Sequence, residues 1–313
     1  MDKKNSNFLL LALKGIAMGA ADVVPGVSGG TIAFISGIYE ELISSIKNLD
    51  FKAIKLFFTG KFPQFIKKIN GSFLFPVIAG IGISVFSLAQ VMTWLLEFHP
   101  IEIWSFFFGL IIASSYLVAK DVKHWDIKSA VSAIIGVLIA YYITVASPTK
   151  TPETLWFIFI SGMIAICAMI LPGISGSFIL LLLGKYAYIM ESISNLKITV
   201  LAVFGAGAII GITSFSHLLS WLLNRFHDIT IALLTGFRVG SLNKVWPWKK
   251  VLTTYTDSSG MEHALTEQSV LPGTFQSATG GDTELLQAIL YCILGIVLIS
   301  AIEYIAKRLK SKA

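Results

Sequence analysis

Two short sequences, VVPGVSGG at residues 23–30 and ILPGISGS at residues 170–177, each interrupt a long apolar stretch with proline and glycine. Proline stops a helix and glycine permits a sharp turn, so a membrane-crossing helix is expected to end at both places. Inside a bilayer every backbone N–H and C=O needs a partner. Non-helical backbone is therefore tolerated there only where it is buried in protein or lines a wet cavity. No other feature constrains the fold of this chain as strongly.

The rest of the chain is apolar enough to lie in a membrane. Of its 313 residues, 55% are hydrophobic and 13% are charged, whereas soluble domains carry about 25% charged residues. Apolar runs of about 18 or more residues, which are long enough to cross a bilayer, recur along the whole length. We predict an all-α, polytopic membrane protein that forms one integral transmembrane domain.

The two breaks belong to an internal duplication, with repeats at residues 1–147 and 148–313. Later stretches of the two repeats are also alike, since GISVFS and TWLLEFH resemble GITSFS and SWLLNRFH. A shift of 147 positions aligns matching residues, among them Pro25 with Pro172, Gly37 with Gly184 and Tyr39 with Tyr186.

Each repeat is predicted to hold a Pro/Gly-broken helical hairpin, re-entrant or fully spanning, followed by three transmembrane helices. Either kind of hairpin adds an even number of crossings, so each repeat crosses an odd number of times and the second repeat is inverted. The hairpins are expected at 8–46 and 155–193, and the later helices at 72–96, 101–119, 129–147, 198–223, 229–244 and 285–306.

The basic residues predict which side faces the cytoplasm. With the N-terminus inside, 17 of the 24 lysines and arginines fall on the inner side, as the positive-inside rule requires. Both termini are then cytoplasmic. Residues 50–69 mix Phe and Ile with Lys and are expected to lie on the inner leaflet, although a plain loop is the alternative. Residues 246–284 form an extracytoplasmic loop, which is either a small lid or disordered.

The breaks themselves are the candidate substrate site. A half-helix that begins at membrane depth presents free N–H groups and a partial positive charge, which together bind anions such as phosphate. Interrupted helices at matching places in inverted repeats are typical of a transporter's central site. A tight turn between two closely packed helices is the alternative. The candidate residues are Pro25, Gly26, Ser28, Gly29, Gly30, Thr31, Pro172, Gly173, Ser175, Gly176 and Ser177.

Two ionisable residues are further candidates. Asp22 lies three residues before Pro25, and its counterpart in the second repeat is Met169. A carboxylate present in one repeat only is a candidate to carry a coupling proton or sodium ion; a helix cap or a partner for Lys14 is the alternative. Arg238 is a candidate phosphate ligand, unless its side chain extends to the outer surface.

No pattern in the sequence indicates an enzyme. The five histidines form no nucleophile–base arrangement, and no His, Cys and carboxylate cluster has the spacing of metal ligands. We therefore predict no catalytic residues, no metal and no cofactor. The net charge of +6 is distributed beside membrane segments, which favours anionic headgroups over nucleic acid as the partner.

Three motifs resemble one family. GAADVVPGVSGGTIAFISGIYEELI at 19–43, LPGISGSFILLLLGKYAYIMESI at 171–193 and GFRVGSLNKVWPW at 236–248 are similar to the signatures of the bacterial domain-of-unknown-function 368 family. The resemblance implies a polyprenyl-phosphate transporter of the cytoplasmic membrane. By this resemblance the substrate is undecaprenyl phosphate, returned by a flippase-type cycle from the outer to the inner leaflet for reuse in peptidoglycan and cell-wall synthesis.

Two other functions remain open at this stage. The same architecture suits a secondary transporter for a small water-soluble anion, and a membrane scaffold for cell-wall enzymes would use the hairpins only for packing. The residues and motifs do not determine the coupling ion or the oligomeric state.

Overall fold

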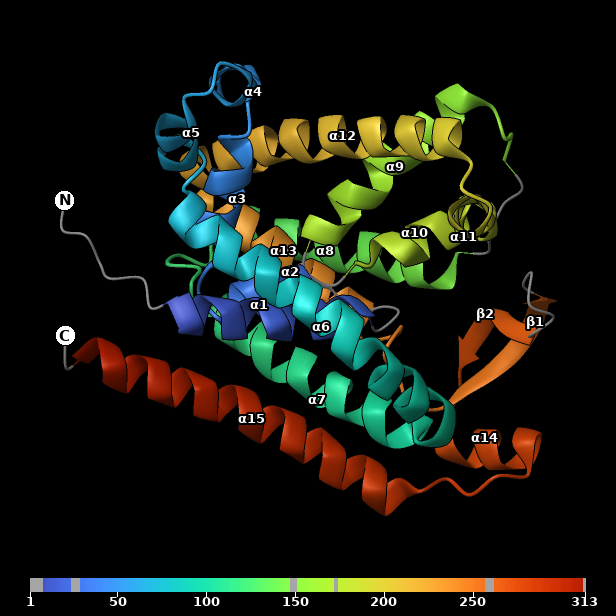
Figure 1. The fold of residues 1–313 in the computed structure, drawn as a ribbon. Helices are drawn as coiled ribbons and strands as arrows, with labels where there is room; N and C mark the ends of the chain where they lie inside the picture. Colours follow the sequence, from blue (N-terminus) through green and yellow to red (C-terminus); the bar gives the residue numbers. More distant parts are fainter. Residues whose placement is uncertain (1–7, 24–28, 147–150, 172–173, 257–261, 312–313) are drawn as a thin grey trace.

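A computed structural model describes residues 8–23, 29–146, 151–171, 174–256 and 262–311 (Figure 1). The first half of the described chain is helical throughout. Its elements are α1 (Phe8–Val23), α2 (Gly29–Ile35), α3 (Tyr39–Lys47), α4 (Phe51–Phe58), α5 (Phe62–Lys68), α6 (Gly71–Phe98), α7 (Pro100–Ala119) and α8 (Ile127–Val145).

The second half has the same order of long and short helices, except that it lacks counterparts of α4 and α5 and has an insertion before its last helix. Its elements are α9 (Leu155–Ile170), α10 (Gly176–Leu182), α11 (Tyr186–Ser194), α12 (Ile198–Arg225), α13 (His227–Ser241), β1 (Lys249–Thr256), β2 (Glu262–Ser269), α14 (Pro272–Thr279) and α15 (Leu285–Ser311).

The long helices pack in pairs through glycines. The pairs are α1 with α6, α9 with α12, α7 with α15 and α8 with α13, and Figure 1 shows α15 running alongside α7. A Cβ atom on Gly109 would lie 2.0 Å from the carbonyl oxygen of Cys292, and one on Gly207 would lie 2.0 Å from that of Phe159. Small residues allow this close approach of helix backbones, as is usual in membranes. The last helix of each half thus packs on a helix of the other half.

The apolar surface matches a membrane environment. α7, α8 and α12 are long and apolar enough to cross a bilayer, and two bent helix pairs raise the number of possible spans to five among the described residues. Large apolar side chains on α8 point outward, with Ile127 83% exposed and Tyr142 71% exposed. A soluble protein buries such side chains.

The second arm of each predicted hairpin consists of two short helices instead of one continuous helix. It is broken in both cases at a glycine with positive φ, Gly37 (70°) and Gly184 (61°). Ile38 N–H donates to the carbonyl oxygen of Ala33 and Lys185 N–H donates to that of Leu180, which is the hydrogen-bond pattern of a glycine helix stop. α10 and α11 consequently meet at 113°.

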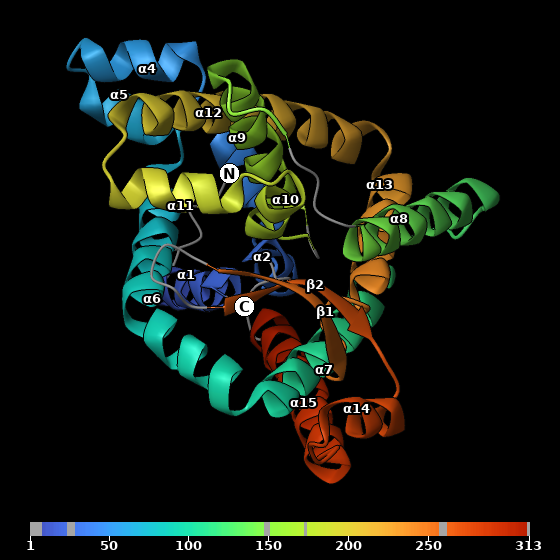
Figure 2. The same ribbon diagram turned by 90° about the vertical axis from the view of Figure 1, so that its right-hand side faces the viewer.

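The two connectors are both folded. Residues 50–69 form α4 and α5 rather than a plain loop, while 246–284 contain an antiparallel pair, β1 and β2, followed by α14. Trp248 is buried against Ile101 and Ala288, so the second connector is fastened to the bundle. The two connectors lie far apart in both views (Figures 1 and 2), and α4–α5 share their side with the start of α1 and the end of α15.

Candidate functional site

The structure describes most of the predicted site residues. Asp22, Gly29, Gly30, Thr31, Ser175, Gly176, Ser177 and Arg238 are described. The other candidates lie outside the described residues: Pro25, Gly26, Ser28, Pro172 and Gly173.

The two breaks meet inside the protein. A Cβ atom on Gly30, in the first turn of α2, would lie 2.6 Å from the carbonyl oxygen of Ile170 at the end of α9. The hydroxyl of Tyr39 donates to the same carbonyl oxygen at 3.1 Å. Thr31 is completely buried next to this junction. The first turn of α2 is therefore in direct contact with the last turn of α9, although Gly30 and Ile170 are 140 positions apart in the sequence.

The start of α2 differs from the prediction. We expected the amides of Gly29, Gly30 and Thr31 to be free, but the Gly29 amide donates to Oδ1 of Asp22 at 2.6 Å, and Gly30 and Thr31 also have partners. A carboxylate is stabilised at this position by the positive end of the helix. The cap predicted as the alternative for Asp22 is thus present, while Lys14 Nζ donates to the carbonyl oxygen of Ser36 at 2.7 Å.

The start of α10 has no carboxylate. Met169 takes the place that Asp22 has at α2, because a Cβ atom on Gly176 would lie 2.6 Å from Cγ of Met169. The side chain of Ser175 does not cap the helix; its hydroxyl lies 2.8 Å from that of Ser177. Among the described residues, none accepts a hydrogen bond from the amides of Gly176 or Ser177. Of the two starts, this one keeps the donors of an anion site.

Arg238 is buried at the centre, not extended to the surface. Its side chain is completely inaccessible, and its Cζ lies 4.4 Å from the centroid of the Phe34 ring in α2. Nη1 donates to the carbonyl oxygen of Ser114 at 3.4 Å, while Nε and Nη2 have no hydrogen-bond partner in the described part of the chain. A buried charge with unsatisfied donors is costly, so this arrangement requires a functional explanation.

Two central residues were not predicted as site residues. The ring of Phe34 lies against the ring of Tyr39, with centroids 4.9 Å apart. Phe34 also faces the Arg238 guanidinium, while the Tyr39 hydroxyl binds the Ile170 carbonyl oxygen. Tyr39 recurs as Tyr186 in the repeat alignment, which was the available signal for its importance. Phe34 carries no such signal, because its role depends on α13 packing beside α2.

A second group of charges lies under the strands. Lys249 of β1 is 8% exposed, and its Nζ lies 3.6 Å from the centroid of the Trp104 ring and 3.7 Å from Oε2 of Glu267. Lys244 also reaches Oε2 of Glu267, at 3.1 Å, and lies over the Phe178 ring of α10. Two cations therefore share one carboxylate in a nearly closed space that joins the strands to α7 and α10.

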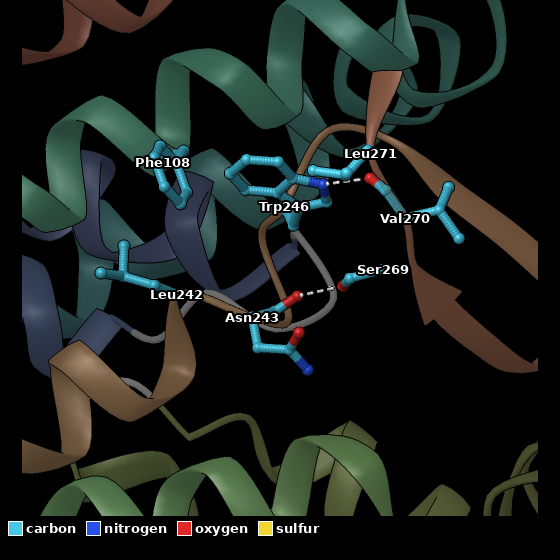
Figure 3. Close-up of a pocket in the computed structure, with 7 residues that line it drawn as sticks. All are labelled: Phe108, Leu242, Asn243, Trp246, Ser269, Val270 and Leu271. Atoms are coloured by element: carbon cyan, nitrogen blue, oxygen red, sulfur yellow. Dashed lines mark hydrogen bonds between the residues drawn. The ribbon is translucent and has the colours of Figure 1, made fainter. Parts of the chain in front are cut away.

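A cavity of about 330 Å³ opens beside this group (Figure 3). Its lining contains none of the predicted site residues, and Trp246 Nε1 and Ser269 Oγ are already bonded to carbonyl oxygens of Val270 and Asn243. The cavity thus belongs to the joint between α7 and the strands. The lining residues are Phe108, Leu242, Asn243, Trp246, Ser269, Val270 and Leu271.

Lys249 predicts a pH dependence of stability. Burial lowers the pKa of Lys249 from 10.5 to about 7, and Glu267 offsets this only in part. Between these two values the unfolded chain binds more protons than the folded one, so the free energy of unfolding rises with pH across this window. Thermal unfolding at about pH 6.5 and about pH 9.5 measures this rise. In Lys249→Met the difference in stability between the two pH values is expected to be smaller. Lys250→Met, at the exposed next position, is the control; an unchanged slope in Lys249→Met would contradict the prediction.

The fold and the buried charges define a polytopic, mostly helical membrane protein with its two helix breaks joined at the centre. The chain belongs to the VCA0040-like, undecaprenyl phosphate translocase-like family, which matches residues 18–263. It is 43% identical over 308 residues to a polyprenyl-phosphate transporter of Vibrio cholerae, covering 98% of this chain and 100% of that protein. A polyprenyl-phosphate transporter of Staphylococcus aureus is 38% identical over 259 residues, 75% of this chain and 85% of that one. No solved structure matches the chain.

These relatives confirm the predicted resemblance to polyprenyl-phosphate transporters, under this family description in place of the domain-of-unknown-function label. Both are named as transporters and not as enzymes, which fits the prediction that the chain is not an enzyme.

Proposed function

We propose that this protein carries undecaprenyl phosphate, or a closely similar polyprenyl phosphate, from the outer to the inner leaflet of a bacterial cytoplasmic membrane. The observation that carries the proposal is Arg238, a completely buried guanidinium whose Nε and Nη2 have no hydrogen-bond partner among the described residues. A planar guanidinium with two adjacent free donors matches the geometry of a phosphate group. The names of the two relatives support the same class of ligand.

In this proposal the phosphate binds between Arg238 and the start of α10. The hydroxyls of Ser175 and Ser177 and the amides of Gly176 and Ser177 supply neutral donors there, while Arg238 supplies the charge. The start of α2 is assigned no phosphate contact in this proposal, because the Gly29 amide binds Asp22 and Gly30 and Thr31 have partners of their own. The isoprenoid tail stays in the bilayer throughout.

We further propose that the two repeats have inverted topology and exchange access by moving against each other. Apart from α4–α5 in the first half and the β1–α14 insertion in the second, the helices follow the same order, which supports this, as does the packing of each half's last helix on the other half. The positive-inside bias of the basic residues supports cytoplasmic termini, and the start of α1, the end of α15 and α4–α5 share one side (Figure 1).

Asp22 is proposed to couple transport to a proton or sodium gradient. It is the carboxylate at the junction, and it binds the Gly29 amide, which is one of the donors at the first helix start. Loss or gain of charge on Asp22 would therefore change the first break and leave the second, where Met169 stands, unaffected.

The proposal is tested by depleting the protein in cells and measuring undecaprenyl phosphate on the outer face of the membrane. Accumulation there is expected, because the return step is lost. In proteoliposomes, the purified protein should move polyprenyl phosphate and leave inorganic phosphate behind. Movement of inorganic phosphate with no effect on the lipid would instead establish a transporter for a small soluble anion. No effect on either ligand would leave only a scaffold role and overturn the proposal.

A further inference from the structure

α4 and α5 form a compact helical pair beside the apolar bundle. Two residues after α4, Gly60 has a φ of 69°, and Lys61 N–H donates to the carbonyl oxygen of Leu56 at 3.0 Å, so the chain turns sharply into α5. Ala53 and Ile69 are buried in the main core. The pair is therefore fastened to the bundle at its base. α5 then meets the first half of α6 at 78°, which places the pair across the end of a long apolar helix.

One side of this pair is aromatic and exposed. The ring of Phe57 lies within 5.6 Å of the rings of Phe58, Phe62 and Phe65, measured between centroids. Phe58 is 81% exposed and Phe62 is 50% exposed. Aromatic and aliphatic side chains next to lysines on a short helix are typical of segments that lie in the membrane interface. This aromatic side is suited to enter the acyl region at the level of the headgroups.

The same pair carries a lysine-lined cavity of about 340 Å³. In residues 50–69 five lysines stand against one carboxylate, Asp50, so the net charge is +4 (5 − 1). Asp50 is already occupied, since it pairs with Lys68 at 2.9 Å and accepts from the Ala53 amide. No other described carboxylate lies within ion-pair distance of the remaining lysines. The lining residues are Lys52, Lys55, Leu56, Thr59, Lys61 and Lys68.

We propose that this cavity binds the phosphate of an anionic phospholipid of the surrounding membrane, with the Phe57–Phe58–Phe62 side inserted beside the lipid's acyl chains. Charge complementarity selects the ligand, because Lys52, Lys55 and Lys61 have no counter-ion in the described part of the chain and a lipid phosphate supplies one. The exposed aromatic side favours a lipid surface over a soluble anion. None of the residues assigned to the transported lipid lines this cavity, so the inference goes beyond the proposed function.

Binding there would have a structural consequence for the site. The pair joins α3, the last part of the first hairpin, to α6. Asn70, at the joint with α6, donates to Glu41 of α3 at 2.9 Å. A bound phospholipid would therefore hold the first hairpin at a constant depth relative to the membrane surface.

The test uses the full-length protein in detergent and native mass spectrometry with added phosphatidylglycerol or phosphatidylcholine. Each lysine near an anionic surface contributes about fivefold to binding. Lys55→Gln/Lys61→Gln is thus expected to lower the preference for phosphatidylglycerol by roughly twentyfold. Lys123→Gln/Lys128→Gln removes the same charge from exposed positions outside the cavity and is expected to keep the preference. Thermal unfolding of both variants checks that they remain folded.

Inorganic phosphate and polyprenyl phosphate, added as further ligands, distinguish the possible sources of the bound phosphate. Inorganic phosphate is expected not to compete with phosphatidylglycerol, since it lacks the chains that the aromatic side contacts, and Phe58→Ser should weaken lipid binding with all lysines in place. An equal loss in the two lysine variants, or no loss in either, would overturn the proposal. A loss confined to polyprenyl phosphate would overturn it as well, because the cavity would then belong to the transport path.

Discussion

Arg238→Met is expected to lower polyprenyl-phosphate transport by roughly a hundredfold or more while the protein stays folded. A hydrogen bond to a charged group contributes about 1.5–3 kcal/mol, and about 1.4 kcal/mol corresponds to a tenfold change in binding, so losing two such bonds to a phosphate gives this factor. Removing a buried charge with unsatisfied donors is also expected to leave the free energy of unfolding unchanged or to increase it. Transport in proteoliposomes and thermal unfolding in detergent measure the two effects.

The two measurements distinguish a ligand role for Arg238 from a structural one. If Arg238 served only to hold α13 against Phe34 and Ser114, the methionine variant would lose stability, and transport per folded molecule would be unchanged. Arg238→Lys keeps the charge without the planar pair of donors, so an intermediate loss of transport is expected. Arg225→Met, at the exposed end of α12, is the control for the removal of one arginine.

Asp22→Asn is expected to abolish gradient-driven accumulation and to preserve passive exchange of the lipid. The asparagine amide oxygen still accepts the Gly29 N–H that Asp22 accepts at 2.6 Å, so the helix start is retained. What the variant loses is the ability to gain and release a proton or to bind a cation. Uptake into proteoliposomes with an imposed proton or sodium gradient, compared with uptake without one, measures the effect.

Asp22→Met provides the matched comparison, because methionine is the residue at the corresponding place in the second repeat. It removes both the charge and the acceptor, so it is expected to lose coupling and also about 1 kcal/mol of stability from the lost cap. If Asp22→Asn still accumulated lipid against its gradient, Asp22 would be a cap and nothing more.

Much of the helical arrangement could be predicted because it depends on short-range features. The span expected at 101–119 is α7 (Pro100–Ala119), and the one expected at 198–223 is α12 (Ile198–Arg225). Run length and hydrophobicity decide such helices, since a bilayer requires a minimum number of apolar residues. The extra breaks at Gly37 and Gly184 were missed, although the glycines recur at matching places, because one glycine within an apolar run is often tolerated.

The state of the candidate site was less predictable. The pattern identified Asp22, the serines and Arg238 as important, but it placed free amides at the start of α2, where Asp22 binds one of them. It also did not decide whether the Arg238 side chain lies at the centre or extends to the surface. For residues 246–284 the sequence predicts either a lid or a disordered loop. The strands there are held in place by Trp248, whose Nε1 donates to the carbonyl oxygen of Thr283 at 2.8 Å. Local composition does not encode this contact.

The sequence by itself determined that the chain is a helical membrane protein built from two similar halves, each broken by proline and glycine, because these properties depend on run length, residue type and periodicity. Only the tertiary structure decided that Gly30 touches Ile170 across 140 positions, and that Arg238 is buried against Phe34 with two donors that find no partner in the segments the structure describes. The physical reason is that burial and hydrogen bonding of a charge depend on which distant helices pack around it, and small residues along several helices permit more than one such packing.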